Sequence, residues 1–101
     1  MAIEYTYGDQ LLRVADGVLE QFSMAIAGSL RIPMAWLSVE TEPRKHDVIR
    51  VQIGKATDPA GSIYSSIAYT NPAFSFEIPA SEEANLRAFL DRAAEDAGRS
   101  K

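Results

Sequence analysis

Short runs of alternating apolar and polar residues extend from about residue 3 to residue 79. A period of two is typical of β-strands that bury one face. Turn residues divide the runs at regular intervals, so the pattern predicts about seven short antiparallel strands. The clearest apolar faces are Ile3, Tyr5 and Tyr7; Leu37, Val39 and Thr41; Ile49, Val51 and Ile53; Ile63, Ile67 and Tyr69; and Phe74, Phe76 and Ile78.

Local turn signals place several of the connections between these strands. Asp16-Gly17 separates the apolar runs 11–15 and 18–22, and an Asp-Gly pair favours a two-residue hairpin turn because it accepts positive φ angles. Pro33 confines the short strand at 30–32 to an edge or a bend, and residues 43–47 form a polar turn. The strand after the hairpin is expected to continue past residue 22, with one face formed by Val18, Phe22, Met24 and Ile26.

After residue 80 the apolar period changes to about 3.6, which predicts an amphipathic helix over residues 82–97. Ser81 is the expected N-cap, and Gly98 is the expected residue for ending the helix in the left-handed conformation. The polar side places Glu83 with Arg87 and Glu95 with Arg99 at a spacing of four, which favours two ion pairs. The apolar stripe consists of Leu86, Phe89, Leu90, Ala93 and Ala97.

These elements predict one mainly β (α+β) domain over residues 1–101, with strands at about 3–79 and a helix at about 82–97. We expect the strands to form a sandwich or partly open barrel. The C-terminal helix would cover its open end, because exposed strand edges need such protection.

Composition limits the functional classes. The 101-residue chain has a net charge of −4, and no basic stripe of the kind that nucleic-acid-binding proteins carry, so we expect no nucleic-acid partner. The absence of cysteine excludes disulfides and thiolate metal sites. The N-terminus lacks the pattern of a signal peptide and no apolar run approaches the roughly 20 residues of a membrane span. We therefore expect a cytoplasmic protein without a membrane partner.

Two parts of the chain resemble small bacterial pleckstrin-homology-like (PH-like) domains of unknown function, particularly those of actinobacterial type. One is Leu30-Arg31-Ile32-Pro33 leading into Trp36-Leu37-Ser38-Val39; the other is Phe74-Ser75-Phe76-Glu77 leading into Leu86-Arg87-Ala88-Phe89-Leu90. The resemblance implies a seven-stranded PH-like fold with a closing helix, and self-association, because bacterial PH-like domains oligomerise as a family. Phosphoinositide-binding members carry basic residues between their first two strands. The corresponding turn here is the acidic Asp16-Gly17, which argues against that ligand.

Five residues form the candidate interaction surface: Trp36, Tyr64, Arg44, Lys45 and Arg50. Arg44, Lys45 and Arg50 are the densest basic group, next to His46, and three cations in one loop suit an anionic ligand. The alternative is a solvated hairpin whose charges are neutralised by acidic neighbours.

Trp36, the sole tryptophan, falls opposite Leu37 and Val39. It is therefore either an exposed anchor for a partner or, with a different register, a core residue. We expect a core or half-buried position, because tryptophan is highly buried on average. Tyr64 is expected to share a face with Ser66, Ala68 and Thr70, which would be either a solvated surface or a shallow groove.

No catalytic residue, cofactor or metal site is predicted. His46 is the only histidine, and no nucleophile elbow or Gly-rich phosphate loop accompanies the serines. The leading hypothesis is a non-catalytic domain that binds a protein partner or itself, with edge strands available for β-augmentation. The alternatives are an anion or lipid-headgroup binder at Arg44, Lys45 and Arg50, and an enzyme with an unrecognised site.

Overall fold

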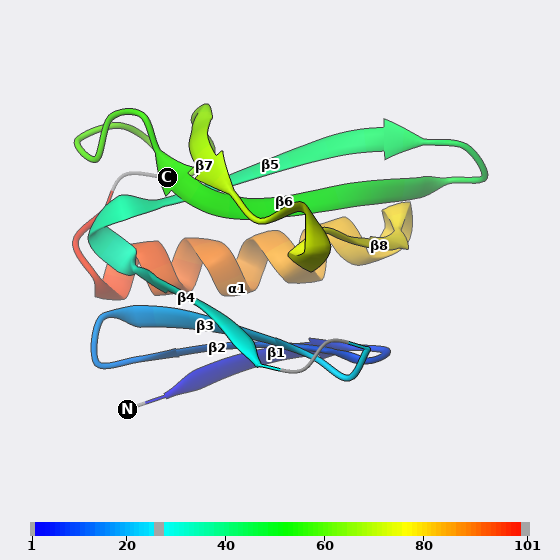
Figure 1. The fold of residues 1–101 in the computed structure, drawn as a ribbon, viewed down its shortest axis with the longest axis horizontal. Helices are drawn as coiled ribbons and strands as arrows, with labels where there is room; N and C mark the ends of the chain where they lie inside the picture. Colours follow the sequence, from blue (N-terminus) through cyan, green and yellow to red (C-terminus); the bar gives the residue numbers. More distant parts are fainter. Residues whose placement is uncertain (1, 26–27, 100–101) are drawn as a thin grey trace.

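Two antiparallel sheets and one C-terminal helix make up the computed structural model, which describes residues 2–25 and 28–99 (Figure 1). Sheet A has the order β1 (Ile3–Tyr7), β2 (Gln10–Ala15), β3 (Val18–Ser23) and β4 (Ser29–Pro33). Sheet B contains β5 (Leu37–Arg44), β6 (Val48–Ala56), β7 (Ile67–Thr70) and β8 (Phe76–Pro79). Within sheet B, β6 pairs with β5 along its length, with β8 near its start and with β7 near its end. The mainly β sandwich with a closing helix is confirmed, with eight strands among the described residues in place of about seven.

The Asp16-Gly17 hairpin joins β2 to β3 as predicted. Both turn residues have positive φ, 53° and 75°, as a type I′ turn requires. The predicted extension of β3 through Met24 is wrong, however. Val18 and Phe22 are half-buried on the outer face, β3 ends at Ser23, and Met24 is exposed; Ile26 lies outside the described residues.

The buried face of β3 is formed by Leu19, Gln21 and Ser23. The hairpin register sets this face, because it places Leu19 beside Val14 and Gln21 beside Leu12. Gln21 tolerates burial because its Nε2 donates to the Phe74 carbonyl at 2.7 Å and to Gln10 Oε1 at 3.0 Å.

The predicted strand through Ile63, Ile67 and Tyr69 is shorter than expected. Only β7, Ile67–Thr70, is a strand, and Ile63 lies in the preceding segment. Ile63 is nevertheless fully buried, and its carbonyl accepts from the Val39 N–H at 2.7 Å. This segment runs beside the start of β5, so the chain contributes an apolar side chain to the core without completing a strand.

The helix α1 (Glu83–Asp96) begins and ends close to the predicted positions. Its start is a 3-10 turn, η3 (Ala80–Glu82), without a side-chain cap, so the expected role of Ser81 is wrong. Its end is confirmed: Gly98 has φ 70°, its N–H bonds to the Glu95 carbonyl, and the Arg99 N–H bonds to the Ala94 carbonyl, the Schellman pattern. No helix within residues 2–25 and 28–99 is long and apolar enough to cross a membrane.

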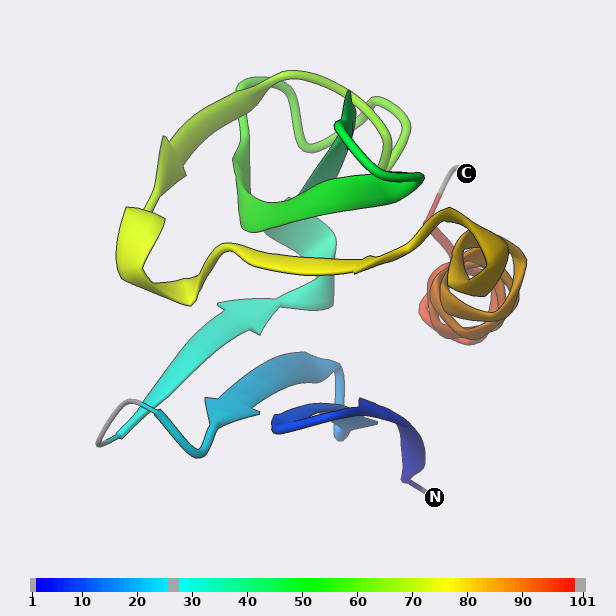
Figure 2. The same ribbon diagram turned by 90° about the vertical axis from the view of Figure 1, so that its right-hand side faces the viewer.

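The helix closes the side of the molecule on which β1 and β5 are edge strands (Figure 2). Its buried residues join both sheets in one hydrophobic cluster, in which Tyr5 lies 6.0 Å from Phe89 between ring centroids. Ala97, expected in the stripe, is exposed because the helix has ended. The buried residues of α1 are Leu86, Phe89, Leu90, Ala93 and Ala94.

Candidate functional site

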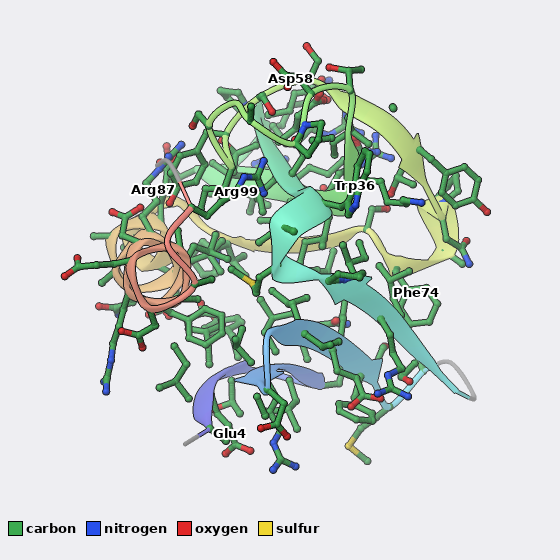
Figure 3. The ribbon with its side chains drawn as sticks, turned by 90° about the vertical axis from the view of Figure 1, so that its left-hand side faces the viewer. Glu4, Trp36, Asp58, Phe74, Arg87 and Arg99 are labelled. Carbon is green, nitrogen blue, oxygen red and sulfur yellow. The ribbon has the colours of Figure 1, made fainter. Side chains whose placement is uncertain are left out.

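Trp36 lies at the surface, with 42% of its surface accessible, so a core position is wrong and the side chain is partly exposed. Pro33 ends β4, and the chain then makes the 3-10 turn η1 (Met34–Trp36) before β5 begins. Met34 occupies the buried side of that turn and is 1% exposed. A single turn thus buries one large apolar residue and directs the other outward, away from α1 (Figure 3).

Lys55 lies beside Trp36, and the exposed Tyr69 lies beside Lys55 on the next strand. The Lys55 Nζ lies 5.6 Å from the centroid of the Trp36 ring, within the range of a cation–π contact. Lys55 is also the cross-strand partner of Tyr69, which is 68% exposed. We call Trp36, Lys55 and Tyr69 the aromatic patch. Among the described residues, Lys55 has no carboxylate within salt-bridge distance.

Gly54 brings Tyr69 to this position. A Cβ on Gly54 would collide with the Tyr69 carbonyl oxygen and would lie 2.6 Å from the Ile67 side chain. Only a glycine therefore lets β7 cross so close to β6. Lys55 and Tyr69 were not predicted as site residues from the sequence. Lys55 itself could have indicated this surface. It continues the alternation of the buried Val51 and Ile53, and a charged residue in that series indicates that the face is exposed to solvent at this point.

The basic residues of the β5–β6 hairpin are brought together but are accompanied by carboxylates. Arg44 lies 3.5 Å from Glu42 and 3.8 Å from Glu77. Arg50 pairs in register with Glu42 on β5 and with Glu77 on β8. An anion at Arg44 would have to compete with these two carboxylates.

The turn of this hairpin borders an open hollow of about 710 Å³. His46 and Asp47 both have positive φ, 65° and 56°, a conformation that His and Asp tolerate better than most residues. The hollow is lined by Pro43, Arg44, Lys45, His46, Val48 and Glu77.

Tyr64 belongs to the helix contact and not to a strand face with Ser66, Ala68 and Thr70 as predicted. Its hydroxyl donates to Asp91 Oδ1 at 2.7 Å, and the Arg87 guanidinium lies 4.6 Å from its ring centroid. Burial, and then the bond to the Asp91 carboxylate, raise the pKa of Tyr64 well above its ordinary value. Tyr64 therefore attaches residues 63–66 to α1.

Tyr5 makes a similar attachment just before the start of the helix, at Glu82 of η3. Its hydroxyl donates to Glu82 Oε1 at 2.9 Å. Burial, followed by the hydrogen bond and the charge of Glu82, raises the pKa of Tyr5 in the same direction. The two tyrosine–carboxylate pairs thus connect β1 to the turn that begins the helix and residues 63–66 to the helix itself.

Arg99 connects the end of the helix to η1, a role that was not predicted from the sequence. Its Nη1 donates to the carbonyls of Met34 and Leu37, both at 2.9 Å, and its Nε donates to the Gly61 carbonyl at 3.2 Å. Burial lowers the pKa of Arg99. The predicted pair of Glu83 with Arg87 is confirmed at 3.1 Å.

Neither a metal site nor a match to a known protein accompanies these features. In the described parts of the chain, no group of three or more His, Asp or Glu side chains is placed to hold a metal ion. No family model, curated protein or solved structure matches the chain. The PH-like resemblance therefore rests on the sequence pattern and on the order of strands before helix.

Proposed function

We propose that this chain is a protein-interaction domain that binds a partner segment at the aromatic patch, with no catalytic step of its own. The supporting observation is the exposure of Trp36 and Tyr69 on either side of Lys55. Tryptophan and tyrosine are the residues that most often anchor interfaces, because they bury large areas with few rotatable bonds. The strands-then-helix order also supports our proposal that the fold is PH-like.

The chemistry of the patch defines the partner segment. An apolar side chain would cover the faces of Trp36 and Tyr69, and a carboxylate would meet Lys55. Among the described residues, Lys55 makes no ion pair with a carboxylate. Binding a carboxylate of the partner would therefore break no existing ion pair of Lys55. Arg44, by contrast, already has two carboxylates nearby, and this difference favours Lys55 over Arg44 as the cation that meets the partner's carboxylate.

β-Augmentation is less favoured at the edge strand β5. The Val39 N–H, which points away from β6, is already bonded to the Ile63 carbonyl. Further along this edge, Pro43 has no N–H to offer. Arg87 of α1 also approaches Thr41 on the same edge, with Nη2 3.4 Å from Oγ1. These contacts leave little continuous backbone for an added strand.

Peptide selection tests the proposal. A random peptide library is selected on the immobilised protein, and we expect enrichment of peptides that combine an acidic residue with an aromatic or aliphatic one. Because Trp36 is the sole tryptophan, its fluorescence reports binding directly. Affinity should fall by about ten-fold or more in Tyr69→Ser, since hot-spot losses exceed ~1.4 kcal/mol.

The matched control is the double variant Arg44→Ala with Lys45→Ala, which we expect to bind the selected peptides unchanged. If no peptide is enriched, or if the enriched peptides bind Tyr69→Ser as well as they bind the original chain, the aromatic patch is not the binding site. Loss of binding in the control variant alone would indicate the basic hairpin.

A further inference from the structure

The outer face of sheet A carries a row of alternating charges across all four strands. In the strand register, Glu4 pairs with Arg13, Arg13 with Glu20 and Glu20 with Arg31. The row is therefore negative, positive, negative, positive from β1 to β4. Arg13 lies 3.9 Å from Glu4, and Arg31 lies 3.6 Å from Glu20, so each arginine in the row has a carboxylate neighbour.

Partly exposed apolar residues flank this row on both sides. Leu11 and Phe22 are register partners on one side, and Ala15 and Val18 are register partners on the other; all four are half-buried. None of the described elements covers this face, and Glu4 points away from the rest of the molecule (Figure 3). A four-stranded sheet thus presents an uncovered face with alternating charges and apolar margins.

We propose that this face of sheet A binds the same face of a second copy of the chain. Consider a two-fold axis in the plane of the contact, parallel to the strands and between β2 and β3. This axis places β1 and β2 of one copy over β4 and β3 of the other. Each row of residues then lies over the same row of the other copy, in reverse order. Glu4 then faces Arg31 of the other copy, and Arg13 faces its Glu20. Every charge in the row therefore faces an opposite charge of the other copy.

The same axis matches the apolar rows. Leu11 faces Phe22 of the other copy, and Ala15 faces its Val18. A two-fold axis perpendicular to the strands would instead place Glu4 over Glu4 and Arg13 over Arg13, which like-charge repulsion disfavours. The charge pattern therefore selects one dimer geometry, which is compatible with the ~30° crossing and ~10 Å separation of stacked sheets.

The size of the face predicts a weak dimer. Four strands spaced ~4.8 Å apart and about five residues long, at ~3.3 Å per residue, cover roughly 320 Å² on each copy. The total is below the ~1,200 Å² of stable interfaces and belongs to transient association. We expect a concentration-dependent dimer that dissociates as salt is raised, because its ion pairs remain partly solvated.

Sedimentation velocity over a concentration series tests the proposal. The original chain should dimerise, and Arg13→Glu should weaken the dimer by about ten-fold or more, because the substituted carboxylate would face Glu20 of the other copy. Adding Glu20→Arg to that variant restores the opposite charges across the two-fold axis and should restore dimerisation. Circular dichroism of each variant checks that it is folded.

Three results would count against this dimer surface. A strict monomer at concentrations near one millimolar in low salt would overturn the proposal. So would a dimer that Arg13→Glu leaves intact, or a loss that Glu20→Arg does not rescue in a folded protein. Tyr69→Ser should dimerise normally, because the aromatic patch is a separate surface; the dimer and the proposed partner binding can therefore fail independently.

Discussion

Arg99 provides the sharpest test of the structure, because the sequence pattern and the tertiary contacts assign it different partners. The helical spacing pairs it with Glu95 in an exposed ion pair worth about 0.2–0.5 kcal/mol. In the fold, its guanidinium donates to the carbonyls of Met34, Leu37 and Gly61. The substitution Arg99→Ala removes these donors from the three carbonyls.

The expected loss follows from the number and type of these bonds. Hydrogen bonds to a charged group contribute about 1.5–3 kcal/mol each, and Arg99 makes two at 2.9 Å. Because Arg99 is partly solvated, we take the low end and expect Arg99→Ala to lower the free energy of unfolding by about 2–3 kcal/mol. For a chain of this length the melting temperature would fall by roughly 10–20 °C.

Urea unfolding followed by circular dichroism measures this change. The matched control is Arg92→Ala, because Arg92 is an exposed helix residue 4.0 Å from Asp96 and should cost no more than about 0.5 kcal/mol. A loss for Arg99→Ala equal to that of Arg92→Ala, and abolished by high salt, would show that Arg99 acts as a surface ion pair. The three carbonyl contacts would then be wrong.

Three further predictions concern the helix, the tyrosines and the β6–β7 crossing. Leu90→Ala should cost about 2–5 kcal/mol in urea unfolding, because Leu90 is fully buried between the helix and the sheets. Stability should fall above about pH 10, where Tyr5 and Tyr64 ionise in the unfolded chain while the folded chain retains their protons; unfolding between about pH 7 and pH 11 measures this. Gly54→Ala should cost at least about 1–3 kcal/mol by overcrowding and should speed amide exchange in β7.

A different result would contradict each of these three predictions. A loss for Leu90→Ala within about 0.5 kcal/mol would place the helix outside the core. The double variant Tyr5→Phe with Tyr64→Phe should have a flatter alkaline limb, so an unchanged slope would assign the alkaline loss to other groups. Unaltered exchange in β7 of Gly54→Ala would mean that β7 does not cross β6 so closely.

Local signals in the sequence were sufficient for several elements. The Asp16-Gly17 turn, the inward face of Ile49, Val51 and Ile53, and the end of the helix at Gly98 were predicted correctly. Each depends on the conformational preferences of a few neighbouring residues, or on the period of one element against one core. These features follow from the chain wherever the element is finally placed.

The surfaces with a proposed function depended on contacts between distant segments. Trp36 is exposed because η1 buries Met34 beneath it, and Tyr69 reaches Lys55 because Gly54 lets β7 cross β6. The charge row on sheet A exists only once three strand registers align four residues that are distant in the sequence. The sequence by itself determined the helix and most of the strands; pairing and packing decided where several strands end and which side chains most faces present, because a shift of one residue moves every side chain to the opposite face.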